Sequence, residues 1–156
     1  MAQVQKVCLC QLDEKQYGFP IEKIIRIIRA VEVTDVPNAE QNTIGVFDYQ
    51  GTILPVMNIR ARLGLPKKEL DVDDRLILIN STSIKYAIVV DSVSDVVILD
   101  EKNSSNAGAS MHDAALQKVA KLPNGIAFIF DIDNLFKANE VLAVNSLPQV
   151  DLLKTK

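Results

Sequence analysis

GVFDYQGTILPVMNIRARLGL, from Gly45 to Leu65, is the stretch that decides the fold. Two apolar runs, 44–49 and 52–57, flank the dipeptide Gln50-Gly51, and this pattern is typical of a β-hairpin with a tight turn. Pro55 has no N–H to donate, so the second strand is expected to be an edge strand or to carry a bulge. The first half of the stretch therefore predicts paired strands.

The second half of the stretch predicts one turn of helix. Asn58 can cap its start, Gly64 can end it and Pro66 follows. Arg60 and Arg62 lie on this turn and are expected to be solvated. No nucleophile, metal cage or phosphate loop occurs in the stretch, so it predicts structure or binding and not catalysis.

The rest of the chain repeats the same pattern of short apolar runs and turns. Further strands are predicted at 6–12, 16–21, 75–80, 85–91, 95–99, 115–122 and 126–131. Segment 21–33 fits both a helical and a strand pattern, and we expect a helical turn to about Ile24 followed by a strand to about Val33. Polar segment 101–110 is expected to be a mobile loop. About ten short strands with few helices predict an all-β (mainly β) fold, as a barrel or a pair of small barrels.

The end of the chain predicts a short C-terminal helix. Asp133 is expected to cap it, with the helix running from Asn134 to about Leu142, and the tail after Val144 is expected to fray.

Composition excludes several classes of function. The 156 residues are 48% hydrophobic, enough to bury a core, and the net charge of −3 provides no field to attract nucleic acid. The longest apolar runs fall far below the roughly 20 residues of a membrane span, so no membrane insertion is expected. No signal peptide pattern opens the sequence, and Cys8 and Cys10 are poor partners for a structural disulfide. We therefore expect a protein of a reducing, cytoplasmic compartment.

Candidate catalytic or metal-binding residues are few. The one histidine, His112, has no evident nucleophile or acid beside it, and Cys8-x-Cys10 lacks two further zinc ligands. Asp131 and Asp133 lack the glycine and glutamate of a calcium loop, and the acidic run 71–74 is expected to be solvated. We expect no catalytic residue, no metal and no cofactor, so a binding module is the favoured class.

The order of five motifs resembles the CheW-like family of chemotaxis coupling proteins. The motifs are YGFPIEKIIRII (17–28), IGVFDYQGTILPVMNIRARLGL (44–65), DDRLILI (73–79), YAIVVDSVSDVVIL (86–99) and NGIAFIFDIDNLF (124–136). The resemblance implies one domain over 1–144, made of two five-stranded SH3-like barrels, and a tail over 145–156. It assigns the first strand and about 80–144 to one barrel and about 15–79 to the other.

The same resemblance implies a function in two-component signal transduction. It implies a non-catalytic adaptor between the cytoplasmic tips of chemoreceptors and the regulatory domain of a CheA-type histidine kinase. The residues that match the family's kinase-binding region are Ile24, Gly45, Val46 and Phe47. Those that match its receptor-binding region are Arg26, Gln50, Val89 and Val90.

Two of these residues depart from the family pattern. Arg26 lies where the family often has glutamate, and Gln50 lies where it usually has arginine. Since surface charge selects partners, the departures allow an adaptor of a non-flagellar pathway, such as type IV pilus motility. A small-ligand-binding or enzymatic β-barrel stays open as another class, and a large polar pocket with perturbed titratable groups would favour it.

Overall fold

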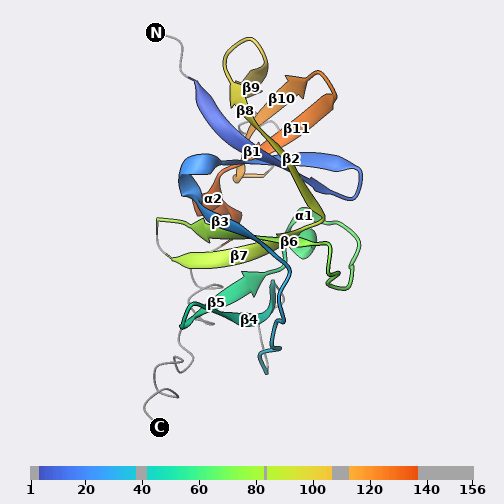
Figure 1. Cartoon of the computed structure of the whole chain (residues 1–156). Coiled ribbons are helices and arrows are strands. Elements are labelled where there is room, and N and C mark those ends of the chain that lie inside the picture. The colour runs from blue at the N-terminus through green and yellow to red at the C-terminus, as the bar shows by residue number, and fades with distance from the viewer. Residues whose placement is uncertain (1–3, 38–41, 83, 107–112, 137–156) are drawn as a thin grey trace.

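The computed structural model describes residues 4–37, 42–82, 84–106 and 113–136, which form two stacked β-sheets. The six-stranded sheet has the order β8-β1-β2-β11-β10-β9, and the five-stranded sheet has the order β3-β6-β7-β5-β4 (Figure 1). The strands of the six-stranded sheet are β1 (Gln5–Leu12), β2 (Lys15–Pro20), β8 (Ser92–Leu99), β9 (Ser104–Asn106), β10 (Leu116–Leu122) and β11 (Gly125–Phe130). Those of the five-stranded sheet are β3 (Ile24–Arg29), β4 (Thr43–Tyr49), β5 (Thr52–Met57), β6 (Arg75–Asn80) and β7 (Lys85–Val90). The all-β class is confirmed.

Three apolar clusters follow from the alternation of side chains along the strands. On β6, Leu76 and Leu78 face a cluster inside the five-stranded sheet, whereas Ile77 and Ile79 face a larger central cluster between the two sheets. A third cluster, around Val7, lies within the six-stranded sheet. Strands β6 and β7 are therefore buried on both faces, which explains their nearly continuous apolar sequences.

The five-stranded sheet closes on itself through a short bridge. After β3 the chain crosses to the opposite edge, where Thr34 and Val46 exchange two backbone hydrogen bonds of 2.8 and 2.9 Å. A Cβ on Gly45 would overlap the Thr34 carbonyl oxygen and lie 2.8 Å from Cγ1 of Val33. Glycine is needed at position 45 because the bridging segment passes directly over it.

Pro55 lies inside the sheet and not at its edge. Val46 directs its N–H and C=O to Thr34, so the facing Val46–Pro55 pair is not hydrogen-bonded. The nitrogen of Pro55 is thus directed toward β7, where pairing begins only at Val56. The prediction of an edge position or a bulge for this strand is therefore wrong, because the one register shift of the β4–β5 pair lies in β4, between Thr43 and Gly45.

A tight turn joins β8 and β9, the two edge strands of the six-stranded sheet. β8 ends at Leu99, and the N–H of Ser104, the first residue of β9, donates to the Asp100 carbonyl at 3.1 Å. The predicted mobile loop 101–110 therefore contains a short strand, β9, and its residues 107–110 lie outside the described part of the chain.

Among the described residues, two short helical segments connect strands and a third follows the last strand. The 3₁₀ turn η1 (Ile21–Lys23) and helix α1 (Ile59–Leu63) lie where the sequence places them, and Asn58 caps α1 at the Ala61 N–H. Helix α2 (Ile132–Leu135) begins two residues before the predicted start, because Asp131 and not Asp133 caps it. Residues 137–142 of the predicted helix lie outside the described residues, as does the tail 145–156.

Several strand assignments differ from the sequence-based ones. The strand after Ile24 ends at Arg29 and not at Val33, because the chain leaves β6 there to reach β4. β8 begins at Ser92 and not at Asp95, since it pairs with β1 along nearly its whole length. β2 belongs with β1 and β7 with β6, because each pair is a hairpin that stays within one sheet. The boundaries 15–79 and 80–144 therefore do not separate the two sheets.

Candidate partner-binding surfaces and the clasp between the sheets

The four residues matched to kinase binding do not share one surface. Phe47 is buried in the cluster of the five-stranded sheet and Gly45 is buried beneath the Thr34 bridge. Ile24 is half-buried against the central cluster, at the other end of the strand order. Val46, on the outer face of β4, is half-exposed. Only Val46 and part of Ile24 are accessible to a partner.

The four residues matched to receptor binding are also dispersed. Arg26 is exposed on β3, and Gln50 is exposed in the β4–β5 turn with a φ of 52°. Val89 is half-buried and packs against the cluster of the five-stranded sheet. Val90 is 0% exposed within the central cluster, so it cannot touch a partner while the sheets stay together.

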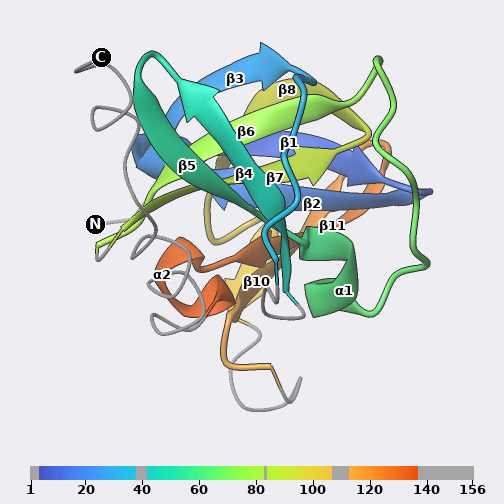
Figure 2. The same ribbon diagram turned by 90° about the horizontal axis from the view of Figure 1, so that it is seen from below.

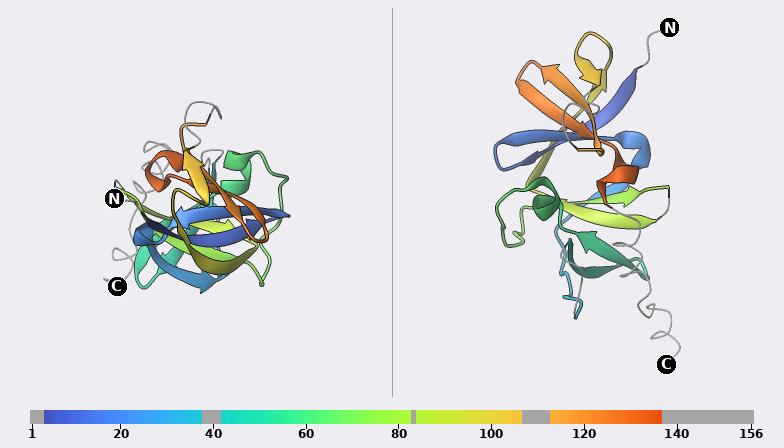
Figure 3. Two further views of the ribbon diagram at one scale, coloured as in Figure 1. Left: turned by 90° about the horizontal axis from the view of Figure 1, so that it is seen from above. Right: turned by 180° about the vertical axis from the view of Figure 1, so that it is seen from behind.

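Exposed apolar side chains occur on β3 of one sheet and on β8 and β11 of the other, where Ile126 of β11 is 57% exposed. Ile25 and Ile27 on β3 are 42% and 36% exposed, and Val96 and Ile98 on β8 are 51% and 55% exposed. β3 and most of β8 lie on the same side of the molecule, opposite α1 and α2 (Figures 2 and 3). An apolar side chain that remains this exposed can bury its surface against another protein.

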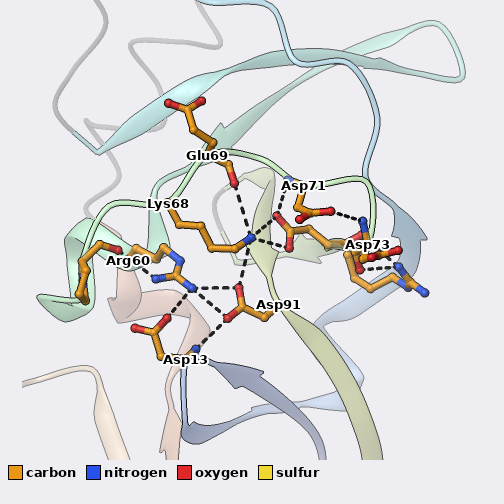
Figure 4. A network of polar contacts seen from close by, with 10 residues as sticks. Asp13, Arg60, Lys68, Glu69, Asp71, Asp73 and Asp91 are labelled. Atoms are coloured by element: carbon orange, nitrogen blue, oxygen red, sulfur yellow. Dashed lines mark hydrogen bonds and ion pairs between the residues drawn. The ribbon is translucent and has the colours of Figure 1, made fainter.

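A network of charged groups joins the two sheets on the opposite side. Arg60 of α1 donates from Nη2 to Asp13 and Asp91, each at 2.9 Å, and from Nη1 to the Pro66 carbonyl at 2.9 Å (Figure 4). Asp13 belongs to the β1–β2 turn of the six-stranded sheet. Asp91 is the single residue between β7 and β8, where the chain passes from one sheet to the other. The side chain of Arg60 is only 10% exposed, so it is a buried connector and not the solvated residue that the sequence predicted.

The network also fixes the backbone around it. The Asp13 N–H donates to Asp91 at 2.8 Å, which holds Asp13 in a left-handed conformation at a φ of 56°. Lys68 contacts Asp91 at 3.8 Å and Asp74 at 2.9 Å, and Asp74 is buried. The prediction of a solvated acidic run is therefore wrong at Asp74, which anchors the loop between α1 and β6.

A second arginine of α1 reaches the six-stranded sheet from the same helix. Arg62 forms a bidentate ion pair with Asp113 at 3.0 and 2.9 Å, and its Nε donates to the Leu135 carbonyl at 2.6 Å. Asp113 precedes β10 and Leu135 ends α2. Arg60 and Arg62 are thus both polar links between α1 and elements of the other sheet.

The pKa shifts in the network have a common cause. Burial acts to raise the pKa of Asp91, but the Asp13 N–H and the Arg60 guanidinium outweigh it and hold the value below its usual range. The guanidinium of Arg62 lowers the pKa of Asp113 in the same way, against the opposing effect of burial. These carboxylates are stabilised as anions by partners already in place, which suits ion pairing and not proton transfer.

A cavity of about 710 Å³ borders this network, and its lining includes Arg60, Asp74 and Asp91. Arg60 and Asp91 bond to each other and Asp74 bonds to Lys68, so these three groups are structural contacts. They therefore give no support to the small-ligand or enzymatic alternative.

The remaining candidate residues are accounted for by packing or capping. Cys8 and Cys10 are buried and free, and burial raises the pKa of both thiols. Asp133 accepts hydrogen bonds from Thr82 and contacts Lys23. Within the described residues, no group of three potential ligands could hold a metal ion, and no helix is long and apolar enough to cross a membrane. His112 lies outside the described residues.

Two stacked β-sheets with this strand order define an all-β domain. The family model for the CheW-like domain matches residues 6–140, and the chain belongs to this family. The chain is 26% identical over 130 residues to the chemotaxis protein CheW of Bacillus subtilis, covering 81% of this chain and 83% of that protein. It is 25% identical to the CheW of Klebsiella aerogenes, covering 92% of this chain and 88% of that protein.

A solved structure has the same fold. The scaffolding protein TtCheW from Thermoanaerobacter tengcongensis superposes with a TM-score of 0.78 at 25% sequence identity. The match covers 88% of this chain and 96% of that one. The resemblance found in the motifs is confirmed by both comparisons.

Proposed function

We propose that this chain is a non-catalytic scaffold that couples chemoreceptors to a CheA-type histidine kinase in a chemosensory array. The observation that carries the proposal is the match of nearly the whole chain to the CheW-like domain, together with its likeness to a scaffolding protein. The exposed isoleucines and valines of β3 and β8 supply apolar surface for such contacts. In this proposal the protein acts in the cytoplasm and reaches the membrane only through its partners.

The kinase contact is proposed at the accessible members of the matched set. Val46 is the exposed contact on β4, and Ile24 contributes its half-exposed face. Gly45 and Phe47 are buried and contribute indirectly, because their packing holds the β4 backbone that exposes Val46. The receptor contact is proposed at Arg26, Gln50 and Val89, with Val90 supporting Val89 from the central cluster.

A calorimetric titration with the regulatory domain of a CheA-type kinase from the same genome tests the kinase contact. The parent chain is expected to bind with micromolar or tighter affinity, and Val46→Glu is expected to bind at least tenfold more weakly. The matched control is Thr52→Glu, which adds the same charge at an exposed position of the neighbouring strand β5. Equal binding by the parent and Val46→Glu would overturn the assignment of this face.

The receptor contact is tested separately with a soluble receptor tip. Arg26→Glu and Gln50→Arg reverse the two departures from the family pattern at exposed positions, so neither change disturbs the core. A change in affinity for the tip is expected in at least one variant, with affinity for the kinase domain unchanged. Identical tip binding by the parent and both variants would contradict a receptor contact at these residues.

A further inference from the structure

Helix α1 lies at the junction of the two sheets and carries two arginines that point to different partners. Arg60 bonds to Asp13 in the β1–β2 turn and to Asp91 at the crossing between β7 and β8. Arg62 bonds to Asp113 before β10 and to the carbonyl of Leu135 in α2. A helix that follows β5 of the five-stranded sheet is thereby tied at four points outside that sheet.

The remaining contact between the sheets is mainly apolar. The central cluster includes Ile77 and Ile79 from one sheet and Cys10 and Leu12 from the other. Apolar packing is not directional, so it resists separation of the two sheets more than it selects one angle between them. Charge-assisted bonds with bidentate geometry are directional and can select that angle.

The bonds of Arg60 and Arg62 to Asp13, Asp91, Asp113 and Leu135 are here called the clasp, and their position relates them to the exposed strands. α1 lies on one side of the molecule, and β3 and most of β8 lie on the opposite side (Figures 2 and 3), although β8 begins directly after Asp91. Because β3 belongs to one sheet and β8 to the other, a change in the angle between the sheets alters the separation of their apolar side chains. We propose that Arg60 and Arg62 are positioning residues that set the separation of β3 and β8.

The geometry is tested without any partner, by the distance between two spin labels in the full chain. Arg29→Cys on β3 and Ile98→Cys on β8 place the labels at exposed positions. Cys8 and Cys10 are buried, and the chain without the introduced cysteines measures their background labelling. We expect a narrow distance distribution in the parent and a broadened or shifted one in Arg60→Met and Arg62→Gln.

Arg75→Met is the matched control, because Arg75 bonds only to the carbonyls of its own neighbours Asp73 and Asp74. Unchanged distributions in folded Arg60→Met and Arg62→Gln would overturn the proposal. If Arg60→Met does not fold, Arg62→Gln decides, since its ion pair is partly exposed and its loss is better tolerated.

Discussion

Replacing Gly45 by alanine tests the closure of the five-stranded sheet. The added methyl group would overlap the Thr34 carbonyl oxygen and press on Val33, so residues 33–34 must move away from β4. Two backbone hydrogen bonds between Thr34 and Val46 are then lost, at about 1 kcal/mol each. Repacking of Val33 adds about 1 kcal/mol, and the lower entropy of the unfolded alanine chain offsets about 0.5–1 kcal/mol. The free energy of unfolding is expected to fall by about 2–2.5 kcal/mol.

Urea unfolding measures this loss as a lower midpoint at an unchanged slope, and amide hydrogen exchange locates it. The amide protons of Thr34 and Val46 are expected to lose protection in Gly45→Ala. They should keep it in the control Gly64→Ala, where φ is 73° and no atom lies within 4 Å of the added methyl. A Gly45→Ala variant that matches the parent's midpoint and protects both amides would refute the steric reasoning.

The remaining predictions concern the core and the clasp. The pKa of Asp91 is lowered in the folded state, so its contribution to stability is present above the carboxyl's ordinary value near 4 and is lost as the pH falls through the lower folded value. Arg60→Met should flatten this loss as the pH falls below about 4, and equal pH profiles of the urea midpoint would count against the network. At pH 7, Arg60→Met should also cost about 3 kcal/mol, because it leaves two carboxylates without their partner; a variant as stable as the parent in urea would show that the ion pairs contribute little. Ile24→Asp should lower the stability by about 2 kcal/mol because its side chain packs against the central cluster, and an unchanged melting temperature would show that it is free for a partner. Tyr86→Phe removes a buried hydroxyl that donates to the Ile132 carbonyl at 3.2 Å, so a loss of about 1 kcal/mol is expected, and a thermal melt that matches the parent's would show that this bond is not stabilising.

The close approach at Gly45 also changes how a substitution at that position is interpreted. The family resemblance places Gly45 in the kinase-binding region, which would predict that a charged residue at position 45 blocks assembly by occupying the kinase surface. In the structure the space beside Gly45 is filled by residues 33–34 of the same chain. A failure of Gly45→Arg to assemble would therefore report internal disruption, and the half-exposed Val46 is the better position for such a test.

Local features of the fold were predictable because their signals are local. The Gln50-Gly51 turn forms as expected, with both residues at positive φ and the Asp48 carboxylate accepting from the Gly51 N–H. Helix α1 is capped at its start by Asn58 and at its end by Gly64, as predicted. Alternation along each strand also indicated which apolar side chains share a face, although it could not show which apolar cluster each face joins.

The clasp could not be predicted because its partners are distant in sequence. Arg60 lies 47 residues from Asp13 and 31 from Asp91, and on a one-turn helix an arginine gives no local sign of burial. Asp74 is also buried, although its neighbours Asp71 and Asp73 are exposed as expected and its partner Lys68 is only six residues away. The charged side chains that hold the sheets together were thus expected to be exposed to solvent. Charge predicts exposure only where the fold brings no partner of opposite charge nearby.

Recovery of a three-component complex tests the central claim most directly. A soluble receptor tip and the kinase regulatory domain are mixed with and without this chain, and the kinase domain that co-elutes with the tip is quantified by size-exclusion chromatography. The scaffold account predicts co-elution that depends on the chain and is reduced by Val46→Glu but not by Thr52→Glu. Co-elution that is the same with and without the chain, or that never occurs, would contradict the claim that this protein couples the two.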